Sequence, residues 1–236
     1  MTRRIRMMAL SVVITWVPGV SPAAVIDNFP GTVFLESLGE PFSPYYAQKF
    51  RALPGVATDL AIQLWGESGP DDIDFRVLVT EVSGSGLDFH PTAVLYESPT
   101  ISFGSAEPPT VLHVPLPSLS LVTDNPYAFL LDAFVTRDGS EGRARVAMNG
   151  TYGEGAFYFN HGFAGDSREQ HFGDAWFFAE SLYPPDYHDI AFQLTFAEPV
   201  PEPSSLSLLV LGLPLLRRQC RQIRNMTLRR SRLPCG

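Results

Sequence analysis

Histidine and acidic side chains are the groups of this 236-residue chain that could transfer protons or bind a metal ion. Among the five histidines, His161, His171 and His188 have aspartates nearby, which would suit a metal site or an acid/base pair. Their separations of 10 and 17 residues match no common ligand spacing. We therefore expect these histidines to lie on the surface without forming a site.

Three aspartates stand close together at Asp71, Asp72 and Asp74 and offer the hard oxygen ligands that Ca²⁺ prefers. The segment is not an EF-hand loop, because the glycine and the terminal glutamate of that motif do not follow at the required positions. A solvated turn before a strand is the favoured interpretation, and a weak calcium site is the alternative.

One carboxylate interrupts an apolar run, because Asp132 lies within residues 127–135. It could be half of a glycosidase pair, which needs a second carboxyl group about 5 to 9.5 Å away, and the sequence does not supply that partner. We expect Asp132 to face solvent or to pair with Arg76 or Arg145 across a sheet.

Several aromatic side chains could stack on sugar rings, because an apolar ring with a polar rim suits that contact. They are Trp65, Trp176, Phe177, Tyr183 and Tyr187. Trp65 is the strongest candidate for stacking on a sugar, because it lies on the more polar face of its expected strand. Burial in a β-sheet core is the alternative for this group of residues.

Motifs for covalent or cofactor chemistry are missing from the sequence: it has no Gly-x-Ser-x-Gly elbow, P-loop, dinucleotide fingerprint or His-Glu-x-x-His motif. Both cysteines, Cys220 and Cys235, lie near the C-terminus, so the preceding body has no thiol nucleophile, thiolate metal site or disulfide. The sequence therefore predicts a protein that is not an enzyme and uses no cofactor.

Short strands are the elements that would position these side chains. Apolar and polar residues alternate with a period of two over residues 60–65, 73–80 and 190–197, as in half-buried strands. Further strands are expected over residues 45–50, 92–97, 100–103, 110–114, 127–135, 143–148, 156–160 and 175–179. Clusters of turn-forming residues separate these strands, and no segment shows the apolar stripe of an amphipathic helix. The pattern predicts an all-β fold over residues 24–198, an antiparallel, jelly-roll-like β-sandwich.

Charge is distributed unevenly along the chain. The 17 basic and 25 acidic residues give a net charge of −8. Ten of the basic residues lie near the two ends, so seven basic residues stand against all 25 acidic ones between Val25 and Pro203, a net charge of −18. An acidic body repels phosphate backbones, which argues against nucleic-acid binding.

The N-terminus has the three parts of a secretory signal peptide. Residues 2–6 are basic, residues 7–20 are apolar, and small residues follow up to Ala24. We expect a signal peptide helix over residues 1–23, with cleavage after Ala23 or Ala24. The alternative is an uncleaved membrane helix, for which the apolar run is shorter than the roughly 20 residues that a span needs.

The C-terminal region has a rigid motif, a short apolar segment and a basic cluster in that order. Val200, Pro201, Glu202 and Pro203 precede apolar residues 204–216, and Arg217 and Arg218 follow. As a helix, the 13 residues of the apolar segment would rise about 20 Å, against a hydrocarbon core of about 30 Å. The segment is predicted to be a marginal transmembrane helix, with the arginines on the cytoplasmic side.

These three elements resemble the PEP-CTERM sorting signal of Gram-negative bacteria that make exopolysaccharide or biofilm. The resemblance implies that residues 199–218 are a sorting tail processed by the membrane enzyme exosortase, with Val200 to Pro203 as its recognition motif. Residues 219–236 form a basic extension that such tails usually lack. The body, over residues 28–196, more weakly resembles the β-sandwich domains that often precede these tails. An anchor that is never cut is the alternative for the tail.

Together these features predict an exported, non-catalytic protein of the cell surface or extracellular matrix, secreted across the inner membrane. Its expected partners are signal peptidase and exosortase during export, with transient contact to the inner membrane, and exopolysaccharide. Two alternatives remain open for the body: a carbohydrate-binding module for exopolysaccharide, and a jelly-roll polysaccharide hydrolase or lyase.

Overall fold

A computed structural model describes residues 24–39, 43–67, 71–105, 107–134, 142–161 and 168–198 of the chain. They belong to one compact unit that ends at Glu198. The expected signal peptide, the motif from Val200 to Pro203, the arginines Arg217 and Arg218 and the basic extension lie outside the described residues. Of the two expected cleavage positions, Ala24 is described and Ala23 is not.

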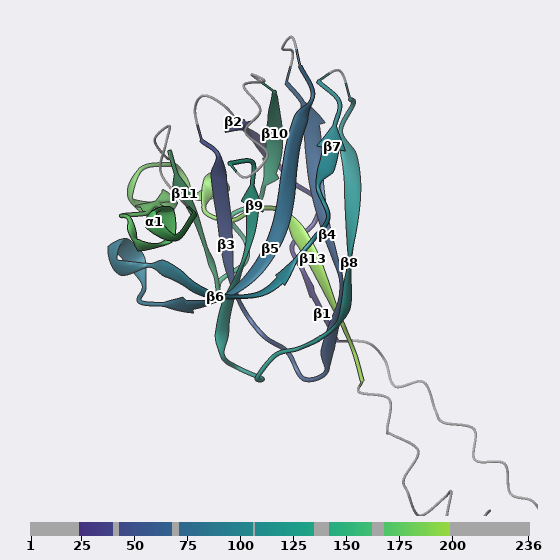
Figure 1. The fold of residues 1–236 in the computed structure, drawn as a ribbon, viewed down its shortest axis with the longest axis vertical. Coiled ribbons are helices and arrows are strands. Elements are labelled where there is room, and N and C mark those ends of the chain that lie inside the picture. Colours follow the sequence, from purple (N-terminus) through teal and green to yellow (C-terminus); the bar gives the residue numbers. More distant parts are fainter. Residues whose placement is uncertain are drawn as a thin grey trace, which may run out of the picture. The chain divides into compact units, whose positions relative to one another are not determined.

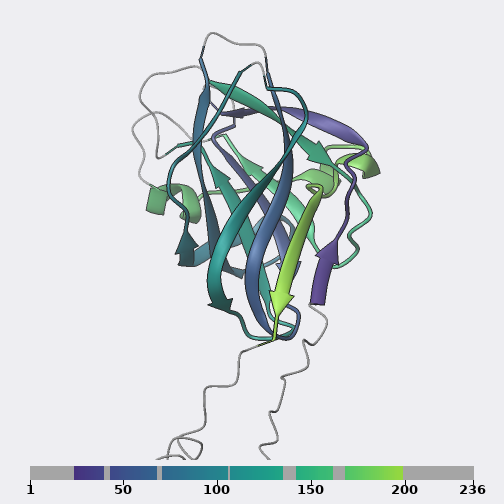
Figure 2. The same ribbon diagram turned by 90° about the vertical axis from the view of Figure 1, so that its right-hand side faces the viewer.

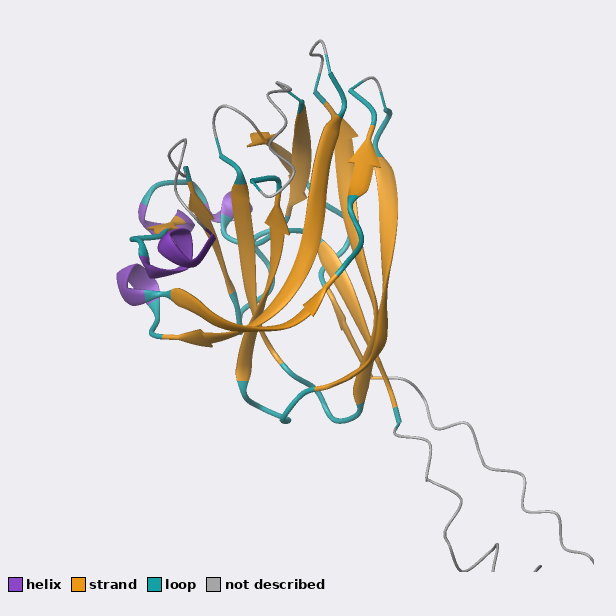
Figure 3. Cartoon of the chain, viewed as in Figure 1, coloured by secondary structure: helices purple, strands orange, loops and turns teal. Residues whose placement is uncertain are grey.

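The described residues form two antiparallel sheets with very little helix, which confirms the all-β prediction (Figures 1 and 3). The first sheet has the order β1-β13-β4-β10-β2, with β8 also paired to β4. Its strands are β1 (Ala24–Asp27), β2 (Val33–Gly39), β4 (Val56–Gly66), β8 (Thr110–Ser120), β10 (Arg143–Met148) and β13 (Phe192–Ala197).

The second sheet has the order β12-β11-β3-β9-β5-β6, with β7 also paired to β5. Its strands are β3 (Tyr45–Arg51), β5 (Ile73–Ser83), β6 (His90–Glu97), β7 (Ile101–Phe103), β9 (Pro126–Asp132), β11 (Ala156–Asn160) and β12 (Phe177–Phe178). The connections contain α1 (Arg168–Gly173) and the 3₁₀ turns η1 (Gly86–Asp88), η2 (Ala179–Ser181) and η3 (Pro185–Tyr187).

The two sheets pack against each other through one hydrophobic cluster that draws on both inner faces. In β4 the buried residues Leu60, Ile62 and Leu64 alternate with positions that include half-buried Gln63 and exposed Trp65, as the sequence predicts. Burial of apolar area at about 25 cal/mol per Å² is the main force that holds two such sheets together. The body is therefore a β-sandwich whose core needs no disulfide.

The first and last strands of the body lie side by side. β1 pairs with β13 from Ala24 opposite Phe196 to Asp27 opposite Gln193, and Figure 2 shows the purple and yellow-green strands next to each other. Sequence analysis did not predict β1 and β2, and it extended β12 to residues 175–179, where only Phe177 and Phe178 form a strand.

A second cluster covers the outer face of the second sheet. Tyr45 and Ala47 on the outer phase of β3 are fully buried beneath Phe89, Trp176 and neighbouring side chains. This is why β3 is buried on both faces over most of its length, although an antiparallel sheet often leaves one face to water.

Asp132 lies inside the protein, and the expectation that it faces solvent or pairs with Arg76 or Arg145 is wrong. Its side chain has no exposed surface, and its Oδ2 lies 2.9 Å from the guanidinium of Arg168 at the start of α1. Arg76 stands opposite Asp132 in the strand register but pairs with Glu97, which also accepts from Arg168. The ion pairs join α1 to the second sheet.

Asp132→Asn is expected to lower the free energy of unfolding by about 3 kcal/mol, because it leaves a poorly hydrated arginine without its buried partner. Glu36→Gln breaks an ion pair whose carboxylate is 59% exposed, and is expected to cost about 1 kcal/mol or less. Urea denaturation of both variants measures the difference, and equal losses would contradict the stabilising role of the buried pair.

Candidate functional site

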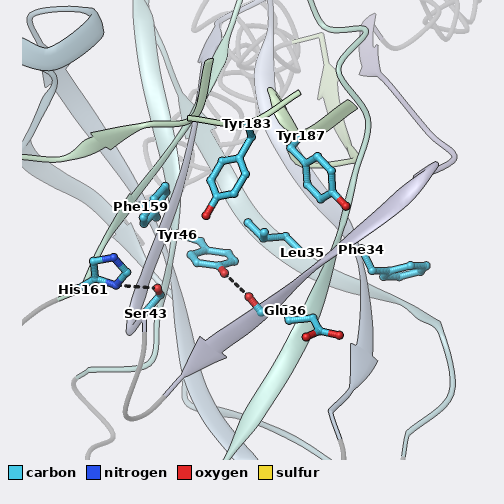
Figure 4. Close-up of a pocket in the computed structure, with 9 residues that line it drawn as sticks. All are labelled: Phe34, Leu35, Glu36, Ser43, Tyr46, Phe159, His161, Tyr183 and Tyr187. Atoms are coloured by element: carbon cyan, nitrogen blue, oxygen red, sulfur yellow. Dashed lines mark hydrogen bonds between the residues drawn. The ribbon is translucent and has the colours of Figure 1, made fainter. Parts of the chain in front are cut away.

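A pocket of about 580 Å³ lies at the side of the sandwich, where β2 forms the edge of the first sheet and faces β3 and β11 of the second. Pockets of this size are typical of small-ligand sites. Figure 4 shows the side chains around it. The lining residues are Phe34, Leu35, Glu36, Ser43, Tyr46, Phe159, His161, Tyr183 and Tyr187.

Aromatic rings form much of this pocket. Tyr46 and Phe159 are almost completely buried, and Tyr183 and Tyr187 lie above Tyr46 in Figure 4. The ring centroids of Tyr183 and Tyr187 are 5.8 Å apart, and Tyr183 is 6.0 Å from Phe159. The rings come from β3, β11 and the segment around η3, so the fold gathers residues that are far apart in the sequence.

Polar groups are fixed around the rings. The hydroxyl of Tyr46 donates to the carbonyl oxygen of Glu36 at 2.7 Å. Burial is the main cause that raises the pKa of Tyr46, with smaller contributions from nearby Tyr183 and Glu67. This hydroxyl therefore keeps its proton at physiological pH.

A second polar contact lies at another part of the pocket, where Ser43 Oγ and His161 Nδ1 are 3.1 Å apart. At the mouth, the Glu36 carboxylate pairs with Arg145 at 2.8 Å. An apolar pocket with a few oriented polar groups is the arrangement that selects a small polar ligand.

Trp65 extends the aromatic surface beyond the pocket. Its ring meets that of Phe34 edge to face at 5.4 Å, and the guanidinium of Arg145 lies 5.2 Å from its centroid. The side chain of Trp65 is 36% exposed. Trp65 thus contacts Phe34, a residue that lines the pocket, while Tyr183 and Tyr187 line the pocket themselves.

Trp176 does not belong to this region, and its assignment as a sugar-stacking residue is wrong. It is 2% exposed, packs edge to face on Phe89 at 5.5 Å, and donates from its indole nitrogen to the carbonyl oxygen of His171. Phe177 is partly exposed and stacks on Phe159 at 5.2 Å, so it supports the aromatic group without lining the pocket.

The three late histidines occupy different environments. His161 is exposed and lines the pocket, while His188 is half-buried and its Nε2 lies 3.0 Å from the carbonyl oxygen of Tyr183. His171 is completely buried against Tyr45 and Phe134, so the prediction of a surface histidine is wrong there.

Within the described ranges, no three His, Cys, Asp or Glu side chains come close enough together to hold a metal ion. Asp71, Asp72 and Asp74 belong to these ranges and form no such group. Asp72 instead accepts a hydrogen bond from the backbone N–H of Ser105 at 3.0 Å. This is a turn contact of the kind expected for an aspartate before a strand.

A buried amide, that of Gln48 on β3, holds the segment that carries Tyr183 and Tyr187, the tyrosine wall of the pocket. Its Oε1 accepts from the N–H of Ile190 at 2.7 Å, and its Nε2 donates to Asp189 Oδ1 at 2.8 Å and to the carbonyl oxygen of Lys49. Gln48, Ser43 and Tyr46 were not identified from the sequence. Only Gln48 had a usable signal there, as a polar residue inside an otherwise apolar part of a strand.

Comparisons with protein-family models, with curated proteins and with solved structures found no match for this chain. In the described part of the chain, no helix has the length and apolar character needed to cross a membrane.

Stability is expected to depend on pH through Asp189. Burial raises its pKa from 3.8 to about 6, outweighing the hydrogen bond from Gln48. Between these values the folded protein keeps a proton that the unfolded chain has released, so the free energy of unfolding falls as pH rises from about 4 to 6, by up to about 3 kcal/mol.

Asp189→Asn retains an acceptor for Gln48 and removes the titration. It is expected to flatten the pH profile and to add about 2 kcal/mol at pH 7. Asp186→Asn, an exposed position in the same segment, is the matched control. Unfolding measured in urea from pH 4 to 8 tests this, and an unchanged slope in Asp189→Asn would contradict it.

Proposed function

We propose that the body is a carbohydrate-binding β-sandwich that acts without catalysis. The observation that carries the proposal is the convergence of aromatic rings from β2, β3, β11 and the η3 segment around one pocket, with Trp65 beside it. Pyranose rings present apolar C–H faces that stack on aromatic rings, and their hydroxyls need acceptors and donors at the edge of the stack.

The polar groups of the pocket fit this ligand class. Hydroxyl groups both donate and accept, so they can pair with the Glu36 carboxylate, the tyrosine hydroxyls and the Ser43–His161 pair. Glu36 is the one residue with a carboxyl group among the lining residues described. A neutral or weakly charged sugar therefore fits the pocket better than a polyanionic one.

The carboxyl groups favour binding over hydrolysis. A glycosidase needs two carboxyl groups about 5 to 9.5 Å apart on either side of the scissile bond. Glu36 is engaged with Arg145, and Asp132 is buried against Arg168 and does not line the pocket. Among the described residues, these positions supply no pair of carboxyl groups for the hydrolase alternative at this pocket.

The strand order supports a jelly roll as the type of sandwich. Eight strands follow the orders β2-β10-β4-β8 and β3-β9-β5-β6, and the chain changes sheets at each step of this set except from β5 to β6. Two interlocked sheets of four strands with such crossings are the jelly-roll pattern.

The expected destination remains the cell surface or extracellular matrix, reached through a signal peptide and a PEP-CTERM tail. Cleavage after Ala23 would leave β1 complete, since the strand begins at Ala24 and pairs with β13. In this setting the sandwich would hold the protein in the organism's own exopolysaccharide.

Tyr183→Ala is expected to weaken binding of a neutral oligosaccharide by about tenfold, because it removes an exposed ring from the wall of the pocket. The fold should be little affected, since Tyr183 is 37% exposed. Val122→Ala, exposed and outside the pocket, is the control. A glycan array identifies the ligand and calorimetry measures the affinities; no glycan bound by the wild-type protein, or equal affinities in the two variants, would overturn the proposal.

Mass spectrometry of the protein recovered from the producing cells tests the sorting proposal. We expect an N-terminus at Ala24 or Val25 and loss of the chain beyond the motif at residues 200–203. An exported protein that retains Gly236 would defeat processing of the tail, and retention of Met1 would defeat cleavage of the signal peptide.

A further inference from the structure

Most of the basic side chains in the described part of the body are neutralised by carboxylates. Four of the six form ion pairs: Arg76 with Glu97, Arg143 with Glu67, Arg145 with Glu36, and Arg168 with Glu97 and Asp132. Within the described residues, Lys49 and Arg51 pair with no carboxylate. Two cations without a direct ion pair are unexpected in a body with a net charge of −18.

The alternation of β3 places both cations on one face. Tyr45 and Ala47 on the outer phase are buried by the second cluster, and Lys49 and Arg51 continue the same phase beyond it. Lys49 stands between Ala128 of β9 and Ala156 of β11, so its neighbours on both sides are small. Space therefore remains above the sheet.

A pocket of about 260 Å³ occupies this space. Gly155 lines it, and a Cβ there would lie 2.2 Å from the carbonyl oxygen of Lys49, so only glycine allows this approach of the two backbones. The stacked rings of Tyr158 and Phe178, 5.3 Å apart, also line it. Among the described residues, it shares no lining residue with the pocket of about 580 Å³ between β2, β3 and β11, the aromatic pocket.

The two cations of this second pocket are available to bind an anionic group. Lys49 Nζ is 3.5 Å from the carbonyl oxygen of Gly84, and Arg51 donates to that of Asp124 at 3.0 Å, so both cations contact neutral carbonyl groups in place of a direct ion pair. Burial, followed by repulsion from Arg51, lowers the pKa of Lys49. Glu154 and Glu180 line the pocket too.

We propose that this pocket is a second binding site, for a sugar residue that carries a carboxylate. The carboxylate would pair with Lys49 and Arg51, the ring hydroxyls would donate to Glu154 and Glu180, and Phe178 would contact the ring. A simple anion would pair with Lys49 and Arg51 but would place its negative charge near Glu154 and Glu180. The hydroxyl groups of a sugar would instead donate hydrogen bonds to these two carboxylates. The proposal does not depend on glycan binding at the aromatic pocket.

The single lysine of the chain gives a direct test, because Lys49 is the only one among 236 residues. Full-length protein labelled with ¹³Cε-lysine has one side-chain signal. Glucuronate is expected to shift that signal saturably and to raise the pKa of the amine, and glucose is not. A glucuronate titration without a saturable shift would overturn the proposal, and inorganic phosphate or acetate binding as tightly as glucuronate would overturn its sugar component.

Variants locate the site by calorimetry. Lys49→Met and Arg51→Gln are each expected to weaken glucuronate binding by about tenfold. Arg76→Gln, which removes the same charge at a position outside the described lining of both pockets, is expected to change it less than about twofold. Near-UV circular dichroism confirms that each variant is folded. Equal losses in all three variants would show a general charge effect and overturn the site.

Discussion

The buried hydrogen bonds of Gln48 hold together the parts of the protein from which the aromatic pocket is built. A buried amide costs free energy unless its donors and acceptors are paired, and here Gln48 bonds to Ile190, Asp189 and its own strand. Those contacts fix Asp189 and Ile190 on β3. The preceding tyrosines, Tyr183 and Tyr187, consequently stand over Tyr46 of the same strand.

Strand β3 serves both candidate sites through its two-residue alternation. Tyr46 and Gln48 on the inner phase contribute the base of the aromatic pocket and the anchor of its wall. Lys49 and Arg51 on the outer phase contribute the cations of the second pocket. One strand would thus support stacking of neutral ring faces at the side of the sandwich and a separate carboxylate-binding site on the outer face of the second sheet.

Sequence periodicity predicted the sandwich well because half-buried strands carry their own pattern. The buried phase of β4 and the bounds of β10 and β11 follow directly from the sequence. β1 and β2 were missed because β1 has only four residues and β2 shows no regular alternation of apolar and polar residues. The outer cluster was also missed, since nothing local shows that a loop folds over a sheet, and Trp176 was consequently assigned to the surface.

The candidate site was only partly predictable for the same reason. Trp65, Tyr183 and Tyr187 were identified as candidate stacking residues by residue type. The contact of Trp65 with Phe34, and the position of both tyrosines in one pocket with Tyr46, depend on the packing of two sheets. The ion-pair partner of Asp132 was predicted wrongly. The partner is Arg168 in the short helix α1, and the sequence of this helix has no amphipathic stripe that would predict a helix there.

A crystal structure of the protein soaked with a neutral oligosaccharide that it binds is the decisive test of carbohydrate binding at the aromatic pocket. Binding there predicts electron density for a sugar ring stacked against Tyr183 or Tyr187, with its hydroxyls near Glu36 and the Ser43–His161 pair. A sugar bound with its full occupancy elsewhere on the sandwich, with this pocket empty, would contradict it.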